Sequence, residues 1–205
     1  MAGQNNYQIQ AGQAKALFLR YNQQALIRKL GLRAESDWLY TAMLHTPYRI
    51  HRETGDVQRM EAGNWVDGNG FEEVMTLLDL VCDSREGRFL TGRWKNQRDF
   101  GLQFHQNLLE SPSDPWARRF ESQPEVFRAA CQALDGQSLP FGDICYAVPL
   151  FDGLSIAVQL WFGDEEFPPN LRFLWDENAL MYLRYETMYY AKDLLLQRIR
   201  EKMEP

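Results

Sequence analysis

A β-hairpin is the clearest structural signal in this sequence, and it lies between residues 144 and 162. Large apolar residues alternate with smaller ones on both sides of the dipeptide Asp152-Gly153. Such alternation is typical of a half-buried strand, and Asp-Gly favours a two-residue hairpin turn because it tolerates positive φ. A further apolar run, Leu171 to Trp175, predicts another strand of the same antiparallel sheet.

Apolar residues at helical spacing predict several helices around this sheet. They are expected over residues 13–30, 71–82, 99–110, 116–134 and 185–202. Pro124 predicts that the fourth of these is two short helices. Gly31 is expected to end the first helix, and Ser122 with Glu125 has the spacing of a capping box.

Short antiparallel strands are expected over residues 37–60, followed by a glycine-rich loop over residues 63–70. The order of elements predicts a single α+β domain over residues 1–205. In this domain an antiparallel sheet is packed by several helices, and the chain ends in a C-terminal helix. A subdivision near residues 111–115, where two prolines interrupt the chain, is the alternative.

Composition limits the cellular compartments and the classes of partner that we expect. The formal net charge is −6, which argues against nucleic acid and against a membrane surface, because both need a basic footprint. No apolar run approaches the about 20 residues that span a bilayer, and the polar first ten residues do not resemble a signal peptide. Three separated cysteines, Cys82, Cys131 and Cys145, are expected to be buried and reduced. We therefore expect a cytoplasmic protein.

An acidic segment follows the predicted hairpin. Asp164, Glu165 and Glu166 lie between aromatic residues and are followed by a double proline. With Asp176 they could supply the oxygen ligands that calcium or magnesium needs, although their spacing matches no known loop. The alternative, which we favour, is structural: one carboxylate caps the backbone of a tight turn and the others are solvated.

Three other groups are weaker candidates. The segment Arg93-Trp94-Lys95 with Arg98 mixes cations with an aromatic ring. It could hold a phosphate or stack a base, or it could form an exposed charged loop with Trp94 in the core. His45 and His51 could meet across a hairpin as a metal site, or each could be isolated. Tyrosines near the C-terminus lie on more than one helical face, which suggests an interface or packing on the sheet; they are Tyr182, Tyr185, Tyr189 and Tyr190.

Several motifs together resemble one family. They are Gly92 with Trp94, Gly142-Asp143, Trp161-x-Gly163-Asp164-Glu165-Glu166-Phe167-Pro168-Pro169, Leu174-x-Asp176, and Tyr182-Leu183 before the last helix. On these residues the chain resembles the uncharacterised microbial family called domain of unknown function 3786, over most of its length. The resemblance implies no established activity. Some relatives carry an added cysteine-rich cluster-binding segment that this chain lacks, so no cofactor is expected.

The sequence therefore favours a non-catalytic binding or accessory protein, because no catalytic constellation accompanies the unusual acidic segment. We expect it to recognise a protein or a small ligand through residues 161–176 and the C-terminal helix, with a homo-oligomer as an open option. The candidate binding residues are Trp161, Asp164, Glu165, Glu166, Arg93, Trp94, Tyr182 and Tyr185. The alternative is a metal-dependent hydrolase that uses Asp164, Glu165, Glu166 and Asp176, so the question of an enzyme stays open.

Overall fold

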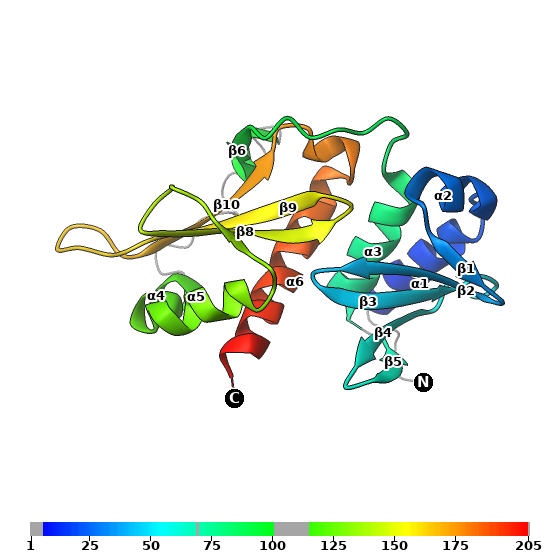
Figure 1. Ribbon diagram of the computed structural model, residues 1–205, viewed down its shortest axis with the longest axis horizontal. Helices are drawn as coiled ribbons and strands as arrows, with labels where there is room; N and C mark the ends of the chain where they lie inside the picture. The colour runs from blue at the N-terminus through cyan, green and yellow to red at the C-terminus, as the bar shows by residue number, and fades with distance from the viewer. Residues whose placement is uncertain (1–5, 69, 101–114, 205) are drawn as a thin grey trace. The chain divides into compact units, whose positions relative to one another are not determined.

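The computed structural model describes residues 6–68, 70–100 and 115–204, which contain six α-helices and two five-stranded antiparallel sheets (Figure 1). The α+β class and the C-terminal helix are therefore confirmed. The chain divides into two compact units. Unit 1 comprises residues 1–88 and 180–194, and unit 2 comprises residues 89–179 and 195–205.

Four helices contribute to unit 1: α1 (Asn6–Phe18), α2 (Gln23–Leu30), α3 (Phe71–Asp83) and the first part of α6 (Tyr185–Met203). The prediction of one helix over residues 13–30 was wrong, because α1 ends at Phe18 and Asn22 is the N-cap of a second helix. Its side-chain oxygen accepts a hydrogen bond from the backbone N–H of Ala25 (3.1 Å), which is the usual capping contact. Gly31 ends α2 in the left-handed conformation, with φ of 61°, as predicted.

The sheet of unit 1 is a meander with the strands in sequence order. Its strands are β1 (Arg33–Glu35), β2 (Trp38–Met43), β3 (Thr46–His51), β4 (Val57–Glu61) and β5 (Asn64–Asp67). The expected loop over residues 63–70 was partly wrong, since β5 lies within it. Ala62 and Gly63 both adopt positive φ, 48° and 85°, and so form a tight turn that returns the chain alongside β4.

The two faces of this sheet have different environments. On the inner face, the hydroxyl of Tyr48 donates to Oε1 of buried Glu73 on α3 (2.6 Å). The neighbouring residue, Arg49, points to the other face, because adjacent strand residues alternate. There its guanidinium lies 4.0 Å from the ring centre of Trp38 and 4.6 Å from that of Trp65. The inner face therefore forms the core, whereas the outer face carries a cation–π stack.

The sheet of unit 2 has the strand order β6-β10-β9-β8-β7. Its strands are β6 (Trp94–Asn96), β7 (Gln137–Ser138), β8 (Ile144–Phe151), β9 (Leu154–Trp161) and β10 (Asn170–Asp176). Asp152 and Gly153 have φ of 49° and 84°, and they join β8 to β9 as predicted. The strand expected from Leu171 to Trp175 is confirmed as part of β10.

Helices α4 (Pro115–Ser122) and α5 (Pro124–Gln132) lie together along one face of this sheet (Figure 1). Two short helices were predicted here, but the capping box was not correct. Ser122 is the last residue of α4, and its hydroxyl donates to the carbonyl of Arg119 (2.8 Å). Most of the helix predicted over residues 99–110, and residues 111–114 of the predicted subdivision, lie outside the described residues.

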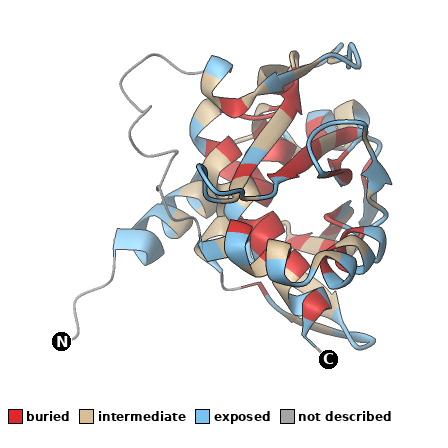
Figure 2. Ribbon diagram, turned by 90° about the vertical axis from the view of Figure 1, so that its left-hand side faces the viewer, coloured by how far each residue is buried: buried red, intermediate tan, exposed pale blue. Residues whose placement is uncertain are grey.

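Burial follows the expected pattern in each unit, with buried residues on the central strands and on the inner sides of the helices (Figure 2). Helix α1 is an exception, since Phe18 is the only one of its described residues that is buried. Nowhere in the described ranges does a helix combine the length and apolarity needed to cross a bilayer.

Candidate functional site

The connection between β9 and β10, residues 162–169, is here called the acidic loop, and it projects from the sheet of unit 2 (Figure 1). Asp164 organises it. Its Oδ1 accepts hydrogen bonds from the backbone N–H groups of Phe167 (2.7 Å) and Glu166 (2.9 Å). Its own N–H donates to the carbonyl of Phe167 (2.9 Å). The two accepted bonds lower the pKa of Asp164, so this carboxylate is ionised and serves the backbone.

Two further carboxylates anchor the base of the acidic loop. The N–H of Phe162 donates to Asp143 (2.7 Å), and the N–H of Gly163 donates to Glu121 on α4 (2.6 Å). Gly163 has no room for a side chain, because a Cβ there would lie 2.8 Å from Cδ of Pro169. These contacts fix where the loop leaves the sheet.

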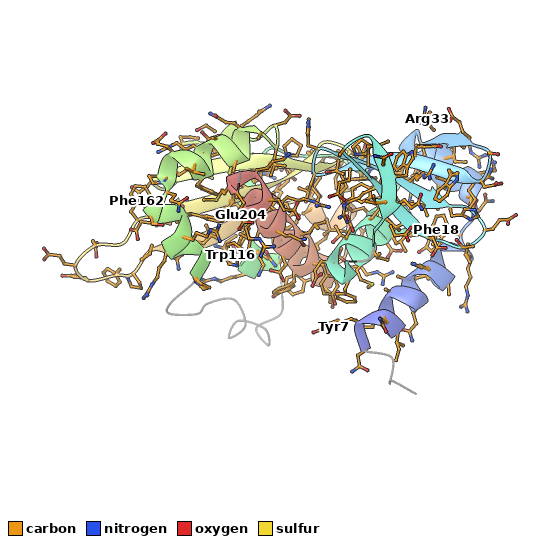
Figure 3. All side chains as sticks on the ribbon, turned by 90° about the horizontal axis from the view of Figure 1, so that it is seen from below. Tyr7, Phe18, Arg33, Trp116, Phe162 and Glu204 are labelled. Atoms are coloured by element: carbon orange, nitrogen blue, oxygen red, sulfur yellow. The ribbon has the colours of Figure 1, made fainter. Side chains whose placement is uncertain are left out.

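The acidic loop presents aromatic rings together with carboxylates. Phe162 and Phe167 of the loop are exposed, as is Trp161 at the adjoining end of β9, and Phe167 is the most exposed of the three at 66%. Figure 3 shows Phe162 at the end of unit 2 that carries α4, with the loop extending beyond it. An open groove of about 600 Å³ is lined by Arg118 and Glu121 of α4 and by residues 163–169. The groove has four carboxylates and one guanidinium, so its charge is negative.

Asp176 does not join the loop carboxylates. It ends β10 opposite Trp94, whereas Asn170 begins the strand opposite Trp161, so six residues of strand, roughly 20 Å, separate Asp176 from the loop. Asp176 is 5% exposed and accepts N–H bonds from Gly92 (2.7 Å), Asn178 (2.9 Å) and Thr91 (3.0 Å). Among the described residues, no group of three or more histidine, cysteine or acidic side chains could hold a metal ion.

The other sequence candidates occupy separate places. Arg93 forms an ion pair with Glu177, and the pKa of Glu177 is lowered because its carboxylate accepts bonds from Arg93. Trp94 packs on the core around Cys145 and Ala147 in unit 2. In unit 1, Tyr182 is only 3% exposed, so its ring belongs to the core.

Tyr185 is half-buried in the first turn of α6, and its hydroxyl lies 2.8 Å from that of Tyr189. The histidines are also apart: His45 lies in the turn between β2 and β3, while His51 ends β3 opposite Trp38. The register therefore separates the two histidines along the hairpin.

A second candidate site, which sequence reasoning missed, lies between helices of unit 1 and is here called the helix pocket. It has a volume of about 340 Å³ and is lined by α1, α3 and the beginning of α6. Asp79 and Asp83, one turn apart on α3, both pair with the guanidinium of Arg184. The N–H of Arg184 also donates to Asp79 (3.0 Å), and the hydroxyl of Tyr21 donates to Asp83 (2.5 Å).

The two carboxyl groups of the helix pocket differ in acidity. Burial raises the pKa of Asp79 to about 6, and the neighbouring Asp83 acts in the same direction. Burial also opposes ionisation of Asp83, but hydrogen bonds from Asp79 and Tyr21 and the charge of Arg184 outweigh it and lower the pKa of Asp83. When the pair holds one proton, that proton therefore resides on Asp79.

One sequence signal could have pointed to the helix pocket. Two aspartates four residues apart interrupt the apolar end of α3, and a helix places such residues on one face. Their partner Arg184 is about a hundred residues further along the chain, so the pairing itself required the tertiary structure.

The three cysteines are free and buried, as predicted. Burial raises the pKa of Cys82 and of Cys145 to about 12 in each case, and it raises that of Cys131 as well. A thiol must ionise to act as a nucleophile, so these side chains are suited to packing.

Comparison with known proteins gives one match. The model of a family described as "Domain of unknown function (DUF3786)" matches residues 22–198. Neither the curated proteins nor the solved structures contain a match.

Proposed function

The chain belongs to the family of domains of unknown function 3786, and on that premise we propose that it is a non-catalytic binding protein of the cytoplasm. Its acidic loop would capture a basic segment of a partner protein. The family description assigns no activity, so the proposal rests on the loop. The observation that carries it is the exposure of Trp161, Phe162 and Phe167 beside carboxylates.

Exposure of an aromatic ring to water is unfavourable in free energy, and exposed rings on a folded protein are typical of contact surfaces. In the acidic loop the ring of Phe167 is exposed although its backbone is fixed by Asp164. A partner would therefore meet a surface that is already ordered, which reduces the entropy lost on binding.

Charge specifies the partner. The groove beside the loop has an excess of carboxylates over its one guanidinium, Arg118. In the described part of the chain, no hydrogen bond or ion pair engages the side chains of Glu165 and Glu166. Arginine suits such a surface, because its guanidinium pairs with carboxylates and stacks on aromatic rings. A segment that alternates arginine with apolar residues would use both features.

The geometry gives little support to the alternative, a metal-dependent hydrolase. Such an enzyme needs several oxygen ligands around one ion and an open position for water. Asp164 serves the backbone of the loop, and Asp176 is bound to three N–H groups at the far end of β10. A melting scan with added Mg²⁺, Ca²⁺ or Mn²⁺ tests the alternative, since a bound ion would raise Tm.

The proposal is tested with a fluorescently labelled peptide of alternating arginine and leucine and a matched peptide of alternating glutamate and leucine. We expect fluorescence anisotropy to detect saturable binding of the basic peptide alone. Phe167→Ser and Glu165→Lys should each weaken binding by about tenfold, an effect typical of hot-spot residues. Glu53→Lys makes the same charge change on an exposed residue of unit 1 and should leave the affinity unchanged. Equal binding to Phe167→Ser and the unmodified protein would refute the proposal.

A further inference from the structure

A second binding site is suggested by the helix pocket of unit 1, which is independent of the acidic loop. Its volume of about 340 Å³ lies within the range of small-ligand sites, which is about 300–1,000 Å³. One wall is apolar and includes Ala14 and Leu17 of α1 with Met75 and Leu78 of α3. Leu17 remains 38% exposed, so an apolar ligand would remove its side chain from water.

The polar end of the helix pocket is held firmly. Arg184 reaches Asp79 through Nε (3.2 Å), also pairs with Asp83, and donates its backbone N–H to Asp79. The side chain of Asp79 is more than nine-tenths buried, although it belongs to the pocket lining. These bonds hold the carboxylates in place before any ligand arrives, which favours binding.

The charges of the lining select the ligand. Asp79, Asp83 and Glu186 supply three carboxylates, and Arg184 supplies the one guanidinium of the lining. A ligand with a carboxylate would face this acidic excess, whereas a cation would reduce it. A protonated primary amine offers three donors, and a carboxylate oxygen can accept more than one hydrogen bond. The ammonium group would therefore share Asp79 with Thr187 and Arg184, and Asp83 with Tyr21 and Arg184.

From this arrangement we infer that the helix pocket binds a small organic amine, whose ammonium group lies against the carboxylates of Asp79 and Asp83 and whose apolar body lies against Leu17, Met75 and Leu78. The competing explanation is that the ion pairs only fasten α3 to the beginning of α6. That explanation accounts for the pairs of Arg184, but it does not account for an open cavity with an exposed leucine beside them.

The test uses hexylamine, with hexanoate and 1-hexanol as probes of equal chain length, at pH 7.5. Backbone amide shifts of the isotope-labelled full chain report where each probe binds. We expect saturable shifts around Leu17, Asp79 and Thr187 with hexylamine, weaker shifts with hexanol and none with hexanoate. Hexanoate binding as tight as hexylamine, or no saturable shift at these residues, would overturn the inference.

Variants separate ligand binding from a structural role. Asp79→Asn keeps the size of the side chain and should weaken hexylamine binding by about tenfold, as expected for loss of a charged hydrogen bond. Should Asp79→Asn not fold, Glu186→Gln removes a lining carboxylate from an exposed position in the first turn of α6 and should weaken binding by about threefold. Leu17→Trp should block the pocket, while Leu19→Ala changes an exposed leucine that does not line it. Unchanged affinity in the carboxylate variants would show that the amine is not recognised by charge.

Discussion

Asp79 is a buried carboxyl group whose folded pKa of about 6 lies above its ordinary value of 3.8. Between these values the folded state binds more protons than the unfolded state, so the free energy of unfolding should fall as the pH rises. This decrease in the free energy of unfolding should be complete above about pH 6. Asp83 does not affect the pH dependence of stability between pH 3.8 and 6, because its pKa is lowered below 3.8.

The stability of the Asp79→Asn variant, relative to that of the unmodified protein, should therefore increase as the pH rises from 4.5 to 7. We expect the difference in unfolding free energy between the two proteins to change by on the order of 1 to 3 kcal/mol in that direction. Urea denaturation at both pH values measures it. A difference that is the same at both pH values would mean that Asp79 titrates normally.

Gly163 is the residue at which the acidic loop depends on a missing side chain. In Gly163→Ala the new Cβ would collide with Pro169, whose Cδ and N lie within 3 Å of its position. We expect a loss of stability of about 1 to 3 kcal/mol and altered amide shifts over residues 162–169.

The matched control for this change is Gly12→Ala. Gly12 lies in the middle of α1 and has nothing within 4 Å of a built Cβ. There alanine should stabilise the helix by roughly 0.5 to 1 kcal/mol. Equal effects of the two substitutions on Tm would contradict the steric account of Gly163.

At the scale of elements, α2 exists as a separate helix because Asn22 caps it. Asn22→Ala removes the acceptor of the Ala25 N–H and should cost about 1 kcal/mol. Gln24→Ala, an exposed change within the same helix, should be neutral or slightly stabilising. Chemical denaturation measures the free energy of unfolding of both variants. A smaller loss of stability for Asn22→Ala than for Gln24→Ala would exclude the cap as the reason why α2 is separate from α1.

In the meander of unit 1, the guanidinium of Arg49 lies against the rings of both Trp38 and Trp65, and we expect this contact to stabilise the sheet. Arg49 also donates two hydrogen bonds to Gln58 on β4, at 2.6 and 2.8 Å. Arg49→Met keeps an extended apolar stem but loses these bonds and the charge, and should cost about 1 to 2 kcal/mol. A red shift of tryptophan emission in the folded variant should accompany the loss, and unaltered emission and stability would count against the stack.

At the scale of the whole molecule, the single domain expected from the sequence stays a prediction. Helix α6 contributes residues 185–194 to unit 1 and the rest to unit 2. Unfolding of either unit would therefore remove part of the other, so we expect one cooperative transition. Scanning calorimetry should give equal calorimetric and van't Hoff enthalpies, whereas two resolved transitions would reveal independent domains.

The homo-oligomer also stays a prediction, which light scattering at several concentrations tests.

Local chemistry explains which elements the sequence predicted well. The β8–β9 hairpin needs only alternation and an Asp-Gly turn, and the division between α4 and α5 needs only Pro124. The errors arose where a local signal was ambiguous. Asn22 interrupts an apolar pattern that continues on both sides of it, and Ala62 adopts a positive φ that is uncommon outside glycine.

Residue order along the chain was enough to predict the α+β class, the elements with strong local signals and the burial of the three free cysteines, because each depends on neighbours along the chain. Which residue each carboxylate contacts became known only from the folded chain. Asp176 is bound to the Gly92 turn rather than to the acidic loop, and Asp79 is bound to Arg184, about a hundred residues away. Such pairings depend on strand register and helix packing, which bring distant residues together only when the chain folds.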